Sequence, residues 1–139
     1  MNEVGANPQA REGSGKVSLP KIFSKNENSS ALAIKSVEGG AIAGMLLVKQ
    51  LISGDEMTLL EIQVEAGVVS PLHAHAHESL VYVVKGKLRS VVGGEAFVLG
   101  PGDVCRHPRE VLHFIEALEQ STFVEIKSPI PDVSRVLGT

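Results

Sequence analysis

The chain has 139 residues, 43% of them hydrophobic and 21% charged, which is the size and composition of one globular domain and excludes wholesale disorder. Thirteen Lys and Arg against sixteen Asp and Glu give a net charge of -3, so we expect neither nucleic acid nor an anionic membrane as a partner. The longest apolar run, residues 41–48, is far too short to cross a bilayer. No signal-peptide pattern opens the chain, and a single cysteine, Cys105, cannot form an intrachain disulfide. We therefore expect a cytoplasmic protein.

Composition divides the chain into three parts. Residues 1–30 are rich in Gly, Pro and Asn, so we expect a loose N-terminal arm with a short strand over residues 17–23. Residues 31–130 hold short apolar runs separated by Gly, Pro and Asp, and they form the predicted domain. Residues 131–139 are the expected C-terminal tail.

Short strands are predicted along the whole domain. Residues 57–64 alternate between apolar and polar side chains, and residues 80–84 read as a strand buried on both faces. Further strands are expected over residues 87–92, 95–99 and 122–127, with Gly-rich turns before the first two. This spacing predicts an all-β protein, either a sandwich or a barrel.

Three of the five histidines lie in the run His73-Ala-His75-Ala-His77. In an extended segment, alternate side chains point to the same face, so these imidazoles would line one wall. Neutral imidazole is the commonest protein ligand of divalent transition metals, and a metal ion would make such a wall favourable inside a β-domain. The alternative is an exposed edge with solvated histidines, which Pro71 and Glu78 at the two ends permit.

The surroundings of this run resemble the first motif of the cupin superfamily, which has Gly, five residues, His-x-His, a Glu and a closing Gly. Here Gly67, His73, His75 and Gly86 match the motif, and Ser79 stands where the motif has its Glu. The second motif has Gly, five residues, Pro-x-Gly and a later His. Residues 94–113 resemble it loosely, with the Pro101-Gly102-Asp103 turn and a terminal histidine, His113.

The resemblance implies a single-domain β-barrel of two facing sheets, of the jelly-roll type, with a divalent transition metal (Fe, Mn, Ni, Zn or Cu) at its centre. Carried over by position, the metal ligands are His73, His75 and His113. The fourth ligand position falls on Ser79, so we expect it to be vacant or filled by water. Glu78 lies one residue early, which turns its side chain to the opposite face unless a bulge intervenes.

Other polar residues receive weaker expectations. His77 shares the parity of His73 and His75, so it is a candidate ligand or proton-transfer residue, or else an imidazole at the entrance. His107 is expected at the surface or in packing. Tyr82 is expected to line a pocket or to belong to the core. Glu125 is expected on a solvated face, with a pocket mouth as the alternative.

Fold does not give the reaction, so three functions stay open. The first is a metal-dependent enzyme that acts on a small oxygenated substrate such as a sugar acid or keto acid, by isomerase, lyase or dioxygenase chemistry. In it the metal acts as a Lewis acid, and His77 or Glu78 moves the proton as the catalytic residue. The second is a non-catalytic module that binds a small ligand or metal, and the third is a structural barrel with an empty site. We also expect a homodimer, because exposed sheet edges need cover.

Overall fold

The computed structural model describes residues 21–139. Part of the strand expected over residues 17–23 lies outside this range, and residues 21–23 form no strand. The elements in chain order are η1 (Asn26–Asn28), β1 (Leu32–Ala33), β2 (Ser36–Val37), β3 (Gly40–Ala41), β4 (Leu46–Ser53), β5 (Thr58–Val64), β6 (Glu78–Lys85), β7 (Leu88–Val92), β8 (Glu95–Leu99), β9 (Val104–His107), β10 (His113–Ala117), β11 (Ser121–Ser128), α2 (Val133–Val136) and β12 (Leu137–Gly138). The prediction of an all-β chain is confirmed.

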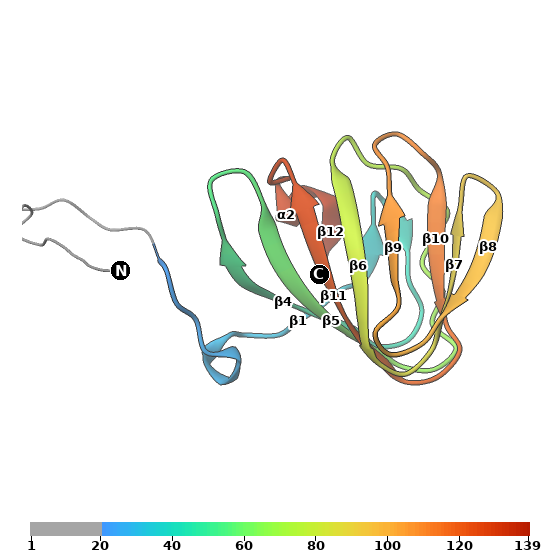
Figure 1. Cartoon of the computed structure of the whole chain (residues 1–139), viewed down its shortest axis with the longest axis horizontal. Coiled ribbons are helices and arrows are strands. Elements are labelled where there is room, and N and C mark those ends of the chain that lie inside the picture. Colours follow the sequence, from blue (N-terminus) through green and yellow to red (C-terminus); the bar gives the residue numbers. More distant parts are fainter. Residues whose placement is uncertain (1–20) are drawn as a thin grey trace, which may run out of the picture.

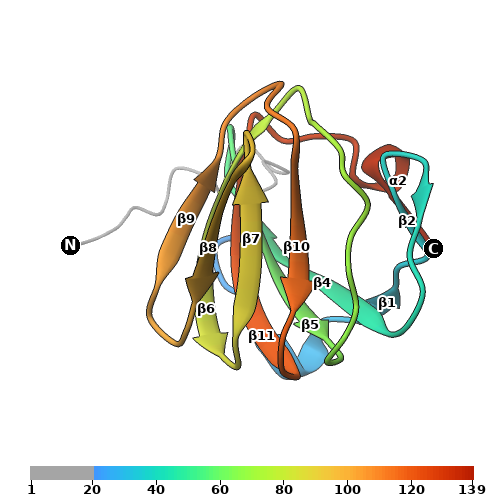
Figure 2. The same cartoon turned by 90° about the vertical axis from the view of Figure 1, so that its right-hand side faces the viewer.

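Three antiparallel sheets enclose the interior. The large sheet has the order β1-β4-β5-β11-β6-β9, and its strands lie side by side in Figure 1. A three-stranded sheet, β10-β7-β8, faces it, and a small sheet, β12-β2-β3, lies at one side together with α2 (Figure 2). The C-terminal residues are therefore part of the fold, because β12 pairs with β2. Within residues 21–139, no helix is long and apolar enough to span a membrane.

The core lies between the large sheet and the two smaller ones. Alternation of inward and outward side chains along β5 and β11 follows the two-residue period of a strand. Leu60, Val83 and Leu88 are completely buried. The turn from β6 to β7 needs glycine at position 86, because φ is +94° there and a Cβ atom would overlap with the Ser121 side chain.

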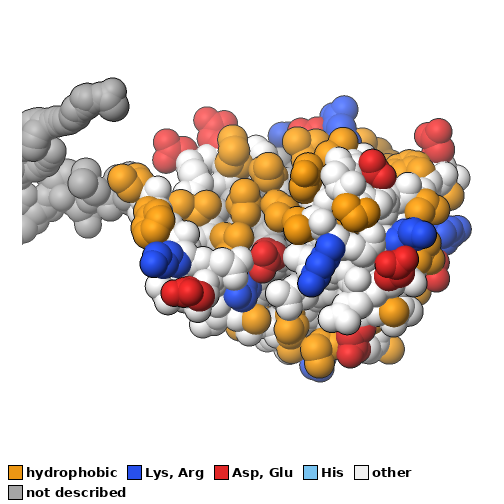
Figure 3. Space-filling model, turned by 60° about the horizontal axis from the view of Figure 1, so that its bottom comes forward, with side chains coloured by type: hydrophobic (Ala, Val, Ile, Leu, Met, Phe, Trp, Pro, Cys, Tyr) orange, Lys and Arg blue, Asp and Glu red, His pale blue; other side chains and the backbone are white. Residues whose placement is uncertain are grey.

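One strand differs from its prediction. Residues 80–84 are expected to be buried on both faces, but among these five only Val81 and Val83 are buried, while Leu80, Tyr82 and Val84 are 50%, 51% and 48% exposed. Tyr82 therefore belongs neither to a pocket nor to the core, and its predicted place is wrong. Among residues 21–139 no second layer covers the outer face of β6, so its apolar side chains are exposed. Elsewhere on the surface, hydrophobic side chains alternate with charged ones, as Figure 3 shows for one face.

Candidate metal centre

The histidine-rich run enters the barrel just before β6. Residues 73–77 form no regular strand, but His73 makes an isolated β-bridge with His113 at the start of β10. Two backbone hydrogen bonds join these residues, with N···O distances of 3.1 and 2.8 Å. This bridge brings the two motif-like segments together, although 40 residues separate them in the sequence.

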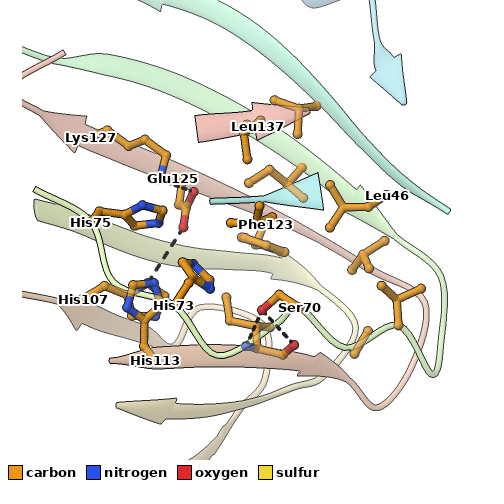
Figure 4. A pocket seen from close by; sticks show the side chains of 17 residues that line it. Leu46, Ser70, His73, His75, His107, His113, Phe123, Glu125, Lys127 and Leu137 are labelled. Carbon is orange, nitrogen blue, oxygen red and sulfur yellow. Dashed lines mark hydrogen bonds and ion pairs between the residues drawn. The ribbon is translucent and has the colours of Figure 1, made fainter. Parts of the chain in front are cut away.

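The three imidazoles predicted to bind metal lie together. One ring nitrogen from each of His73, His75 and His113 can be chosen so that the three atoms lie within 4.8 Å of one another. The ring centroid of His73 lies 4.6 Å from that of His75 and 4.3 Å from that of His113. Both His75 and His113 are buried. Figure 4 shows the three rings turned toward one another.

Each of these rings is oriented by an oxygen that accepts a hydrogen bond from its Nδ1–H. His73 donates to the Pro71 carbonyl, and His113 donates to the Val111 carbonyl at 3.0 Å. A carbonyl oxygen can only accept, so Nδ1 carries the proton in both rings. His75 Nδ1 lies 2.6 Å from the Glu38 carboxylate. All three Nε2 lone pairs are therefore free, which is the arrangement of histidines that ligate a metal.

Burial keeps these imidazoles neutral. It lowers the pKa of His75 to about 2, with the Lys127 ammonium acting in the same direction. It lowers the pKa of His113 to about 4, and His107 adds to that shift. Neutral imidazole is the form that binds a metal ion, so the donor set fits a divalent transition metal.

At the position where the cupin motif has its fourth ligand, Ser79 is hydrogen-bonded to Lys127. Ser79 is 1% exposed, and its hydroxyl accepts a hydrogen bond from Lys127 Nζ at 3.1 Å. The same ammonium lies 3.0 Å from a Glu125 carboxylate oxygen and 3.2 Å from His77 Nε2. Lys127 thus uses all three of its N–H donors within the protein.

Glu125 lies inside the barrel, so its expected place on a solvated face is wrong. It is 8% exposed and points inward from β11, with the same parity as Lys127 and the core residue Phe123. Burial by itself would raise the pKa of Glu125, but the Lys127 ammonium and nearby His107 lower it overall. Glu125 is therefore an ionised carboxylate that faces the histidines (Figure 4).

His107 is also buried, at 1% exposure, so a surface position is excluded. Burial lowers its pKa, and its ring stacks on His113 with centroids 4.1 Å apart. Its Nε2 lies 3.5 Å from Ser90 Oγ and 3.7 Å from Cys105 Sγ. Its Nδ1 has no hydrogen-bond partner, and the nearest carboxylate oxygen, on Glu125, is 3.9 Å away.

These side chains line one cavity of about 60 Å³. The histidines, Glu125 and Lys127 lie at one end, and the apolar side chains Leu46 and Phe123 lie away from them together with Ser70, as the labelled side chains in Figure 4 show. The lining residues are Val37, Leu46, Val48, Ile62, Val64, Val68, Ser70, His73, His75, His107, His113, Ile115, Ala117, Phe123, Glu125, Lys127 and Leu137.

Comparison with known proteins identifies the family. A family model described as the cupin domain matches residues 60–126, the segment that contains both histidine motifs. The protein belongs to the cupin superfamily. A search of curated proteins found no match.

Solved structures agree with this assignment. This cupin is 26% identical to an RmlC-like cupin from Shewanella frigidimarina, with a TM-score of 0.71 over 81% of this chain and 94% of the other. It is also 26% identical to KdgF from a Halomonas species, with a TM-score of 0.68 over 81% and 96% of the two chains. A predicted oxalate decarboxylase from Thermotoga maritima is 17% identical over 78% and 100%, and its TM-score of 0.69 shows a shared fold.

The two residues predicted to be catalytic lie apart in this cupin. His77 is buried and stacks on His75 with centroids 4.2 Å apart, and Lys127 lies against its Nε2. Glu78 faces outward, where Arg106 donates to its carboxylate at 2.7 Å, and it does not line the cavity. The Ser79 side chain points inward and the Glu78 side chain points outward, which is the strand register expected from the sequence.

Three functional candidates were missed by sequence reasoning. Lys127 and Glu125 share the parity of Phe123, but the opposite parity of β11 carries Val124 and Ile126, so the pattern does not reveal which side is buried. Glu38 approaches His75 from the turn between β2 and β3, and no spacing signal connects the two.

Proposed function

We propose that this protein is a metal-dependent enzyme that acts on a small oxygenated substrate. His73, His75 and His113 would hold one divalent transition metal ion. The observation that carries the proposal is the orientation of these rings, since every Nδ1 is engaged by an oxygen and every Nε2 is free. Three protein ligands leave room for a substrate atom, which is a property of catalytic metal sites.

The chemistry depends on which groups face the cavity. Bound there, the metal would polarise a substrate carbonyl or enol oxygen as a Lewis acid, or support dioxygenase chemistry if it is iron. The chain's own residues would bind, orient and move protons. A neutral three-nitrogen set is compatible with Fe, Mn, Ni, Zn or Cu.

Proton transfer is better assigned to Glu125 than to Glu78. Glu125 lines the cavity as an ionised carboxylate held by Lys127, whereas Glu78 is paired with Arg106 on the outside. His77 would then act as a positioning residue, because its Nε2 accepts from Lys127 and is not free for substrate. We therefore propose Glu125 on β11 as the proton-transfer residue in place of His77 and Glu78.

A non-catalytic binding module is the second candidate, and the Lys127 ammonium beside the site favours it, because a cation there opposes a second positive charge. Elemental analysis of protein purified without a histidine tag, followed by turnover assays with keto acids and uronates, separates the two. The enzyme proposal expects about one metal per chain and turnover that Glu125→Gln abolishes. Absence of turnover on every panel member, with or without bound metal, supports the module.

We also propose a cytoplasmic homodimer. The outer face of β6 and its neighbour β9 exposes Leu80, Tyr82 and Val104, and Tyr82 pairs in register with Val104. The flanking charges, Glu78 and Arg106, neutralise each other within the chain. Two copies of this face can therefore meet about a two-fold axis without bringing like charges together. A free cysteine fits a reducing compartment.

A further inference from the structure

The cavity changes character along its length. At one end lie the buried histidines together with Glu125 and Lys127, and toward the other end the lining side chains are aliphatic and aromatic except for Ser70 (Figure 4). The Ser70 hydroxyl is already hydrogen-bonded to the backbone of Ile115. Strands of two different sheets contribute to the apolar end, since Leu46 comes from β4 and Leu137 from β12. A polar molecule that filled this space would place its hydroxyl groups against carbon atoms.

We propose that the substrate has an oxygen-bearing head and a short apolar body, rather than polar groups along its whole length. This inference rests on the proposed function, because the head would bind at the metal. The body would lie among the apolar side chains around Leu46 and Phe123. A short-chain 2-oxo acid has this chemistry, whereas a uronic acid does not.

The charges at the polar end support a single anionic head. Among residues 21–139, Lys127 is the only Lys or Arg that lines the cavity, and its three donors are used by Glu125, Ser79 and His77. No cation is left to bind a second carboxylate. A buried hydroxyl or carboxylate without a partner loses its hydration without compensation, which opposes binding of a polyhydroxylated acid.

One atom at the polar end lacks a partner. His107 Nδ1 is buried and makes no hydrogen bond with any residue that the structure describes. Nearly all buried polar atoms in proteins are hydrogen-bonded, so a ligand oxygen or a water molecule is expected there. Because the ring stacks on His113, this partner would lie next to the metal, at the head of the substrate.

Size limits the apolar body. A cavity of about 60 Å³ has room for a few water molecules, or for a head group with a short alkyl chain. Each methylene transferred from water into an apolar site contributes about 0.8 kcal/mol, equivalent to about fourfold in affinity. Affinity should therefore rise with chain length until the cavity is full.

The experiment uses the full chain loaded with zinc, after its metal content has been measured. Isothermal titration compares pyruvate, 2-oxobutyrate, 2-oxopentanoate and galacturonate. We expect each added methylene to tighten binding about threefold to fourfold, and galacturonate to bind at least about tenfold more weakly than 2-oxopentanoate. Equal affinities along the series, or tighter binding of galacturonate, would overturn the inference.

Variants locate the effect in the cavity. Leu46→Phe, which narrows the apolar end, should abolish the gain in affinity from pyruvate to 2-oxopentanoate. Val68→Leu, a smaller change at another lining residue, serves if Leu46→Phe does not fold. Leu80→Phe is the matched control, because Leu80 lies on the outer surface. A chain-length effect that survives both cavity variants contradicts the inference.

The metal content and the dependence on chain length distinguish a failure of the proposed function from a failure of this inference. Zinc bound at one per chain with no dependence on chain length rejects the apolar body and leaves the metal site standing. A chain that retains none of Zn, Fe, Mn, Ni or Cu after loading rejects the proposed function and, with it, this inference.

Discussion

Each imidazole of the three-histidine group depends on the oxygen that accepts its Nδ1 proton. For His73 and His113 that oxygen belongs to the backbone, and for His75 it belongs to a side chain, Glu38. A carboxylate in this position fixes the ring and makes Nε2 a stronger donor to metal. Glu38 is therefore the residue outside the ligand set whose loss should matter most for metal binding.

Glu38→Ala is expected to lower zinc affinity about 10–100-fold, because His75 loses the partner that orients it. Glu38→Gln should lower zinc affinity less, because its amide oxygen can still accept a hydrogen bond from His75 Nδ1. Competition with a chromogenic chelator measures both. Glu78→Ala is the matched control, because that carboxylate faces outward. Unchanged affinity in Glu38→Ala would show that this contact does not support the site.

The sequence predicts some site residues and cannot predict others, for physical reasons. A histidine wall at His73 and His75 follows from their alternation in an extended chain, whereas His113 follows from the resemblance to the second cupin motif. Glu125 resists prediction because a charged residue in a strand is far more often exposed. Its burial depends on compensation by Lys127, which only the folded structure reveals.

At the scale of strands and turns, β5, β7, β8 and β11 lie within a residue of their predictions, because their alternation or flanking turns define them. The burial of β6 was misjudged because a run of apolar side chains does not show whether a second layer covers the strand. The shortest strands, such as β2 and β12, carry no periodic signal, and they form because β12 returns to pair with β2.

The turn after β6 allows a direct test of backbone conformation. Gly86→Ala should destabilise the protein by about 1–3 kcal/mol, since a side chain must adopt positive φ and would overlap with Ser121. Urea unfolding followed by circular dichroism measures this change. Gly94→Ala offers a control with positive φ but no neighbour within 4 Å, and it should cost less. Equal losses would mean that the overlap contributes nothing.

For the whole molecule, the buried histidines make stability depend on pH. Burial lowers the pKa of His77 and His113 from 6.5 to about 4, and that of His75 further. Between pH 6.5 and pH 4, these histidines are protonated in the unfolded chain but neutral in the folded chain. The metal-free protein should therefore have its full stability above pH 6.5 and lose it progressively as the pH falls toward 4.

Urea unfolding of metal-free protein at several pH values between about 7.5 and 4.5 measures this dependence. His113→Gln provides the comparison, because it removes one of the contributing imidazoles and should give a shallower curve. A free energy of unfolding that stays constant across this range would contradict the assignment of neutral, buried imidazoles.

The proposed dimer is tested at the apolar face of β6. Light scattering should give the mass of two chains, and Tyr82→Glu should shift the protein toward monomer by placing a charge in the interface. Val98→Glu, at a similarly exposed position on β8, is the control and should leave the mass unchanged. A wild-type mass of one chain at every concentration excludes the dimer.

The central claim is that three histidines from two distant segments hold one metal ion. Elemental analysis of untagged protein after dialysis, compared with His113→Ala, tests it most directly. About one transition metal per chain is expected in the wild type, and near-complete loss in the variant, because two imidazoles seldom hold a divalent ion against water. Wild-type metal content in His113→Ala, or no metal in the wild type even after loading, would contradict the account.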